Sequence, residues 1–264
     1  MLIYLFLILL LGLVLGSFVT AFTYRFPRGL DFIRGRSFCD HCRRPIRWYD
    51  NLPLVSYALL KGRCRDCHQK ISSRYPLIEI STALVLLSPF LISLKCGVLL
   101  SPICEWHTAL GGFFSLLIVF LFLVSMIVFV IDFEKRIIPD ELIFISLCTV
   151  AFFLVLGSFP DFYLHLLSAF LSSIVLLLLH LITRGKGMGL GDVKYALTPG
   201  LFLGWPLSLI WLFVSFLTGA VVAIILILIR RAHGKDKIAF GPFLAFSFVI
   251  VALFGNVILK WIIF

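Results

Sequence analysis

The stretch from Thr108 to Ile131 reads TALGGFFSLLIVFLFLVSMIVFVI, and Asp132 follows it directly. A helix needs about 20 apolar residues to cross the hydrocarbon core of a bilayer, so these uncharged residues predict a transmembrane helix. An ionised carboxylate at the end of such a helix is costly, and acidic residues kept at membrane depth usually carry function. Asp132 is therefore the first candidate catalytic residue.

The whole chain has the composition of a membrane protein. Hydrophobic residues make up 61% of its 264 residues, and its mean hydropathy is +1.12. A soluble domain of this length cannot bury that much apolar surface. We therefore predict an all-α polytopic membrane protein with about eight transmembrane helices. Besides the run above, the expected spans are 2–24, 77–94, 139–156, 162–183, 195–204, 206–229 and 240–264.

The basic residues indicate the orientation of these spans, because positively charged loops stay in the cytoplasm. Residues 25–74 contain 12 of the 23 Lys and Arg, and smaller clusters lie at 135–136, 184–194 and 230–237. All four clusters lie on one side of the membrane only if the short segment 195–204 crosses it. We therefore expect that segment to be a tilted or discontinuous span, with both chain termini outside. Asp132 and a second aspartate, Asp192, would then lie at the cytoplasmic face.

The loop between the first two expected spans, residues 25–75, is the main soluble part of the chain. It holds two Cys-x2-Cys pairs that are 21 residues apart, a spacing slightly longer than that of a usual zinc ribbon. Four thiolates form a closed structural zinc site, which would stabilise a loop with little core of its own. Two disulfides are the alternative, but the cytoplasm is reducing. We expect zinc, with His41 and His68 as substitute ligands or solvent-facing neighbours. The four cysteines are Cys39, Cys42, Cys64 and Cys67.

Three cysteines lie outside this loop. Cys96 and Cys104 fall in the expected outer loop between the second and third spans. An oxidising compartment allows a disulfide there, and location alone leaves both the bridged and the free form open. Cys148 lies inside an apolar stretch, and we expect it to pack there.

A second acidic residue, Asp192, ends the sequence Gly189-Leu190-Gly191-Asp192. Glycines allow the backbone to come close to a substrate. Two carboxylates that lie close together share one proton, so one can act as a general base toward water and the other as a general acid. The alternative is that each aspartate only ends or caps a helix. We favour a catalytic pair of Asp132 and Asp192, and the sequence does not assign the proton to either.

The chain resembles the bacterial prepilin peptidases of type IV pilins and type II secretion pseudopilins over nearly its whole length. Each matching motif is short, and their order and spacing together make the resemblance specific. The matching stretches are 12–18 (GLVLGSF), 24–27 (YRFP), 51–57 (NLPLVSY), 62–64 (GRC), 74–79 (RYPLIE), 131–132 (ID), 138–140 (IPD), 189–194 (GLGDVK), 203–205 (LGW) and 240–243 (FGPF).

The resemblance implies a GxGD aspartyl endopeptidase that removes a basic leader from a prepilin or pseudopilin at the cytoplasmic face of the bacterial inner membrane. It places the catalytic pair at Asp132 and Asp192 and zinc at the four loop cysteines. It also implies methylation of the new N-terminus with S-adenosylmethionine. No glycine-rich nucleotide-binding turn is visible, so the cofactor site depends on the resemblance, with Gly62 and Arg63 as candidates. The expected division is 1–24 first transmembrane helix, 25–75 zinc-binding loop associated with methyl transfer, and 76–264 peptidase domain.

Secondary candidates would support the substrate or the site. Glu79 lies just inside the second expected span, where the family pattern also has an acidic residue, and it would hold the loop or a substrate amine. Lys194 would bias the charge of Asp192 or extend to the membrane interface. Asp140 and Glu141 fit the start of a helix instead. The secondary candidates are Glu79, Gly189, Gly191 and Lys194.

Two functions from other classes are alternatives. A membrane-anchored zinc ribbon would use the basic loop to bind nucleic acid or another acidic partner, but an anchor needs neither eight spans nor two aspartates at membrane depth. A proton-coupled transporter would use the aspartates as a relay, but the sequence has no convincing inverted repeat. We therefore expect precursor proteins and the lipid bilayer as partners, and no nucleic acid.

Overall fold

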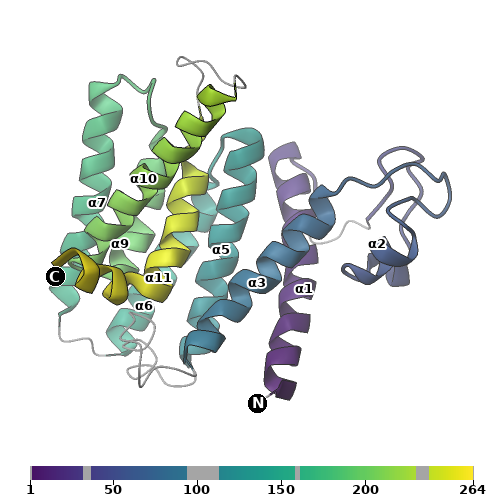
Figure 1. Ribbon diagram of the computed structural model, residues 1–264, viewed down its shortest axis with the longest axis horizontal. Coiled ribbons are helices and arrows are strands. Elements are labelled where there is room, and N and C mark those ends of the chain that lie inside the picture. Colours follow the sequence, from purple (N-terminus) through teal and green to yellow (C-terminus); the bar gives the residue numbers. More distant parts are fainter. Residues whose placement is uncertain (1, 32–36, 94–112, 158–160, 230–237, 264) are drawn as a thin grey trace. The chain divides into compact units, whose positions relative to one another are not determined.

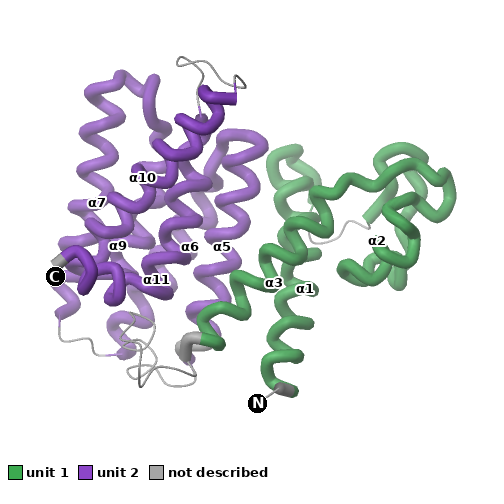
Figure 2. The backbone as a smooth tube through the Cα atoms, viewed as in Figure 1, with its two compact units in different colours: residues 1–91 green, residues 92–264 purple. Residues whose placement is uncertain are grey.

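The structure is a computed structural model. It is all-helical in the residues that it describes, apart from two isolated β-bridges in the cysteine loop (Figure 1). This confirms the predicted fold class. The chain forms two compact units, Met1–Leu91 and Ile92–Phe264 (Figure 2). Cys96 and Cys104, for which the sequence leaves both the bridged and the free form open, lie outside the described residues. The described residues are 2–31, 37–93, 113–157, 161–229 and 238–263.

The first unit pairs two long helices, α1 and α3, which the cysteine loop connects. Glycine brings them together, since a Cβ atom at Gly12 would lie only 2.7 Å from the Cα atom of Ala83. A Cβ atom at Gly16 would lie equally close, at 2.7 Å, to the Cα atom of Glu79. Small residues permit such close contacts between membrane helices. The elements of this unit are α1 Leu2–Arg25, η1 Phe26–Arg28, η2 Trp48–Asn51, α2 Val55–Leu59 and α3 Arg74–Ser93.

The second unit is a helical bundle whose core is apolar and aromatic. The rings of Phe122 and Phe202 both lie edge-on to Phe248, with centroids 6.1 and 5.6 Å away. The buried Trp211 donates its indole N–H to the carbonyl oxygen of Leu244 at 2.9 Å, so its polar atom is satisfied. The elements are α5 Phe113–Lys135, α6 Asp140–Leu156, α7 Phe162–Ile182, α8 Leu190–Tyr195, α9 Leu197–Leu203, α10 Leu207–Leu228 and α11 Gly241–Ile263.

Six of the described helices are long and apolar enough to cross a membrane, namely α1, α3, α5, α7, α10 and α11. The expected span at 139–156 forms α6, which has 17 residues. The expected short span at 195–204 forms α9, and Tyr195 at its start ends the preceding helix α8, which meets α9 at Ala196. That this segment crosses the membrane stays a prediction, and the expected count of eight spans is approximate.

Hydroxyl groups hold these two short helices inside the second unit. The phenol oxygen of Tyr195 lies 3.1 Å from Ser125 Oγ on α5, and Thr198 Oγ1 lies 3.0 Å from Ser146 Oγ on α6. Helix α9 also packs closely on α7, where a Cβ atom at Gly200 would lie 2.8 Å from the Cα atom of Ala169. These contacts fix α8, which carries Asp192, against the long helices.

We expect Gly200→Ala to destabilise the second unit, because the added methyl group has no room between α9 and α7. Overpacking of this kind costs about 1–3 kcal/mol. Thermal unfolding of the purified protein in detergent measures the effect. Gly219→Ala on α10 is the matched control, since its Cβ atom would meet neighbours at an ordinary 3.5 Å. Equal midpoints for the two variants would contradict the close packing of α9.

Candidate functional site

The two candidate aspartates are buried in the second unit. Asp132 lies in the last turn of α5 and Asp192 in the first turn of α8, and each is only 6% exposed. Helix α11 contacts both α5 and α8, so it connects the two helices that carry the carboxyl groups. Carboxylates removed from water to this extent need a partner or a function.

Each aspartate keeps one oxygen atom open. Asp192 Oδ2 accepts a hydrogen bond from the Gly189 backbone N–H at 3.1 Å, which caps the start of α8. Asp192 Oδ1 and Asp132 Oδ2 are buried and have no hydrogen-bond partner within the described residues. Buried polar atoms are nearly always satisfied, so these two oxygens mark a place for a water molecule or a substrate group.

Asp192 also has the electrostatics of a proton-sharing group. It lies outside the six candidate spans. Burial and, second to it, the negative charge of Asp132 raise the pKa of its carboxyl group to about 7, although the Gly189 N–H lowers this pKa. A carboxyl group that retains a proton near neutral pH can act as a general acid beside an ionised partner.

Gly241, the first residue of α11, lies directly against Asp132. A Cβ atom at this position would lie 2.6 Å from Asp132 Oδ2. In the sequence this glycine is only part of the FGPF motif at 240–243, which predicts no role for it. Glycine has a low helix propensity, so its presence at the start of a helix was a sign of some special role. The sequence could not show that this glycine lies next to Asp132.

The remaining candidates near the aspartates have structural contacts. A Cβ atom at Gly191 would lie 3.2 Å from the side chain of Ile138, so this glycine packs beside the connection between α5 and α6. Lys194 Nζ forms a salt bridge with Asp140 Oδ2 at 2.6 Å, and both side chains are more than half exposed. The pair connects α8 with the start of α6.

The four loop cysteines come together as the sequence predicts. Their sulfur atoms all lie within 4.8 Å of one another, and all four are free thiols, which excludes the two-disulfide alternative in this structure. Each pair lies on a similar turn, in which Arg43 and His68 adopt positive φ and their N–H groups bond back to Cys39 and Cys64. Neither His41 nor His68 belongs to the cluster. Such a cluster can hold a metal ion.

The thiols of the cluster influence one another. Burial opposes ionisation of Cys39, but the backbone N–H groups of Cys42 and His41 and the nearby thiols lower its pKa to about 7. The Gln69 backbone lowers the pKa of Cys67, yet burial and the neighbouring thiols outweigh this and raise it to about 11. A bound cation would displace protons from these thiols, because cysteine ligands of a metal must be thiolates.

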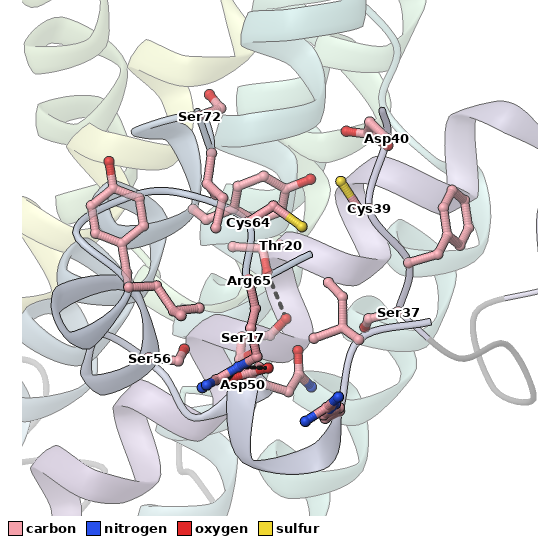
Figure 3. Close-up of a pocket in the computed structure, with 18 of the residues that line it drawn as sticks. Ser17, Thr20, Ser37, Cys39, Asp40, Asp50, Ser56, Cys64, Arg65 and Ser72 are labelled. Atoms are coloured by element: carbon pink, nitrogen blue, oxygen red, sulfur yellow. Dashed lines mark hydrogen bonds and ion pairs between the residues drawn. The ribbon is translucent and has the colours of Figure 1, made fainter. Parts of the chain in front are cut away.

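A cavity of about 310 Å³ lies in the first unit, between the ends of α1 and α3 and the cysteine loop (Figure 3). Glu79 lines it and accepts a hydrogen bond from the Leu54 N–H at 2.9 Å. The cofactor candidates Gly62 and Arg63 are not among its lining residues, and the Arg63 side chain is exposed. Gly62 instead adopts a φ of 67° beside the ring of Tyr57, which does line the cavity.

Comparison with known proteins identifies two matching family models. The bacterial peptidase A24 N-terminal domain matches residues 10–92, and the type IV leader peptidase family matches residues 119–224. No solved structure matches the chain.

The chain is also similar to curated proteins named prepilin leader peptidase/N-methyltransferase. The one from Aeromonas hydrophila is 33% identical, with 97% of this chain and 92% of the relative covered. The one from Aeromonas salmonicida strain A449 is 36% identical, with 86% and 74% covered. The one from Pseudomonas aeruginosa is 31% identical, with 96% and 91% covered.

We expect Gly241→Ala to lower turnover more than stability. The new methyl group must displace the Asp132 carboxyl group, and a misplacement of about 1 Å costs up to roughly a hundredfold in rate. Alanine is a better helix former than glycine, so α11 should not be weakened. Cleavage kinetics on a candidate prepilin and thermal unfolding measure the two effects, with Gly219→Ala as control. An unchanged kcat would show that Asp132 has room to adjust.

Proposed function

The chain belongs to the type IV leader peptidase family, and we propose that Asp132 and Asp192 are the catalytic pair with which it cleaves the leader from prepilins or pseudopilins. The observation that supports this most strongly is the pair of open carboxylate oxygens, buried at the ends of α5 and α8. A transporter or a nucleic-acid-binding zinc ribbon is not favoured, because the curated relatives are peptidases along most of the chain.

The proposed mechanism divides one proton between the two carboxyl groups. Asp192, whose pKa is raised to about 7, holds the proton, and Asp132 acts as the base. Asp132 takes a proton from a water molecule that attacks the scissile carbonyl carbon, while Asp192 donates its proton to the carbonyl oxygen. Collapse of the resulting diol breaks the C–N bond. The proton on Asp132 passes to the leaving amine, and the hydroxyl proton returns to the pair.

We further propose that this reaction takes place at the cytoplasmic face of the bacterial inner membrane, with both chain termini outside. The basic residues Lys135 and Arg136 follow Asp132, and Lys194 follows Asp192, which supports a cytoplasmic position for both aspartates. The hydrophobic stalk of the substrate would lie in the bilayer and bring its leader to the pair. Gly189 supports the site by donating its N–H to Asp192.

Zinc is the proposed metal of the cysteine cluster. Four thiolates match its preferred tetrahedral sulfur coordination and leave no open position for a reacting water. Its role would be structural, because residues 25–75 contain only short helices and no buried apolar side chain within the described part of the loop. The proposed functional division assigns the loop at residues 25–75 to methyl transfer and residues 76–264 to the peptidase, except that Glu79 at the start of α3 lines the cavity of the first unit.

S-adenosylmethionine is the proposed methyl donor, as the names of the relatives indicate a methyltransferase. When bound, it would supply an activated methyl group for the new N-terminal amine. The cavity of the first unit fits a ligand of this class, since sites for small molecules typically have about 300–1,000 Å³ and a few polar groups. Glu79 would face its positively charged groups, and Gly62 would act through Tyr57.

We expect Asp132→Asn and Asp192→Asn each to abolish leader cleavage while zinc content stays unchanged. An amide can neither accept the proton from water nor supply an acidic one, and loss of general acid–base catalysis costs roughly 10²–10⁴-fold. Incubation of each variant with a candidate prepilin, followed by mass spectrometry of the product, measures the effect. Glu141→Gln is the control, because Glu141 is exposed on α6. Cleavage by either pair variant at the normal rate would exclude the proposed mechanism.

We expect Cys39→Ser and Cys64→Ser to lower the zinc content from about one ion per chain and to loosen the loop. The loop would then become sensitive to proteolysis. Elemental analysis and limited proteolysis of the purified protein provide the readouts, and Cys148→Ser, an exposed cysteine outside the cluster, is the control. Full zinc content in the cluster variants would contradict the assignment of these ligands.

A further inference from the structure

We propose that His180 positions Asp192 for leader cleavage, by holding the peptide group whose N–H binds the Asp192 carboxylate. This inference rests on the proposed function, in which Asp192 forms a catalytic pair with Asp132. His180 acts through the backbone, so it is a positioning residue and not a catalytic one. In the sequence it is a single polar residue in a run of leucines, which predicts no such role.

One peptide group connects the imidazole of His180 with the Asp192 carboxylate. The Nδ1 atom of His180 lies 2.8 Å from the carbonyl oxygen of Met188. The next N–H along the chain, that of Gly189, donates to Asp192 Oδ2 at 3.1 Å. This carbonyl and this N–H belong to one planar peptide group, and in a trans peptide, as here, they point in opposite directions. The imidazole therefore lies on one side of the group and the carboxylate on the other.

The Met188 carbonyl also fixes the tautomer of the imidazole. A carbonyl oxygen only accepts hydrogen bonds, so Nδ1 of His180 carries the hydrogen atom of this bond. Hydrogen bonds in a chain polarise one another, so donation by His180 strengthens donation by the Gly189 N–H. Asp192 Oδ2 is held in this way. The second oxygen of the same carboxyl group, Oδ1, is thereby oriented, and it is the one with no hydrogen-bond partner in the described part of the chain.

The turn between α7 and α8 is folded around this histidine, which lies in the last turn of α7. Gly185 adopts a φ of 71°, and its N–H bonds back to the His180 carbonyl at 2.8 Å. A Cβ atom at Gly185 would lie 3.2 Å from His180 Cε1, so this glycine lets the turn close over the imidazole. A histidine that only capped α7 would instead donate to a carbonyl of the last turn of its own helix.

A second histidine of α7, His165, makes a similar bond without reaching the aspartates. It lies in the first turn of the helix, and its Nδ1 atom is 2.8 Å from the carbonyl oxygen of Leu201 on α9. Its ring also packs against a glycine, since a Cβ atom at Gly204 would lie 2.8 Å from Cε1. Of the two histidines, only His180 bonds to a peptide group that in turn binds a proposed catalytic residue. His165 is therefore a matched control that anchors backbone alone.

The test is steady-state cleavage of a candidate prepilin by the full-length, zinc-loaded protein in detergent. We expect His180→Leu to lower kcat roughly tenfold or more with little change in KM, because Asp192 loses its orientation while no contact with the substrate is removed. His180→Asn should recover most of the turnover, since its amide nitrogen takes the place of Nδ1 as the donor. His165→Leu should lower the thermal unfolding midpoint as much as His180→Leu does, with kcat close to that of the unaltered protein.

Tryptic cleavage at Arg184 and Lys186 measures the order of the turn independently of activity. Both residues are exposed and lie between His180 and Met188. The rate of cleavage at these two sites should rise in His180→Leu, because the turn loses its anchor, and it should return toward the original rate in His180→Asn.

The outcomes separate this inference from the function on which it rests. A lower kcat in His180→Leu, with recovery in His180→Asn and normal kcat in His165→Leu, supports the positioning role. An unchanged kcat in His180→Leu, or equal losses in the two leucine variants, overturns it. Low turnover in His180→Asn also overturns it, so the test stays decisive if His180→Leu does not fold. Cleavage by Asp192→Asn at the normal rate overturns the proposed function as well, whereas an inactive Asp192→Asn beside a fully active His180→Leu overturns the role of His180 alone.

Discussion

The site of this protein depends on the burial of two carboxyl groups inside an apolar bundle, where an ionised carboxylate is energetically costly. Asp132 and Asp192 remain in place because the second unit holds their helices from several sides, through packed rings, hydroxyl pairs and glycine contacts. One oxygen atom of each carboxyl group has no hydrogen-bond partner in the part of the chain that the structure describes. A fold selected for stability alone would satisfy these atoms, so the energetic cost indicates a site built for a water molecule and a substrate carbonyl.

In the first unit, glycine contacts and one buried carboxyl group hold a metal-binding loop against two membrane helices. Its loop has little apolar core, and the cluster of four cysteine sulfur atoms takes the place of such a core. Gly16 lets α1 approach α3 at Glu79, and Glu79 in turn holds the backbone of Leu54, a non-glycine residue with a positive φ of 58°. The membrane helices and the metal-binding loop are therefore joined at one buried carboxylate, which also lines the cavity.

The sequence predicted the features that depend on local composition. Apolar runs predicted the long helices. Cysteine spacing predicted the cluster. Contacts between distant segments could not be predicted in the same way. Gly241 lies against Asp132 across the bundle, and Gly62 lies against Tyr57 beside the cavity; neither approach leaves a periodic or compositional signal.

The most direct measurement of the central claim is an experimental structure of the full-length protein bound to a pilin-leader peptide in which a hydroxyl-bearing isostere replaces the scissile amide. The account predicts that this single hydroxyl group lies within about 2.6–3.2 Å of both Asp132 and Asp192. A hydroxyl group that contacts only one of the two aspartates, with the other turned toward protein or lipid, would contradict it.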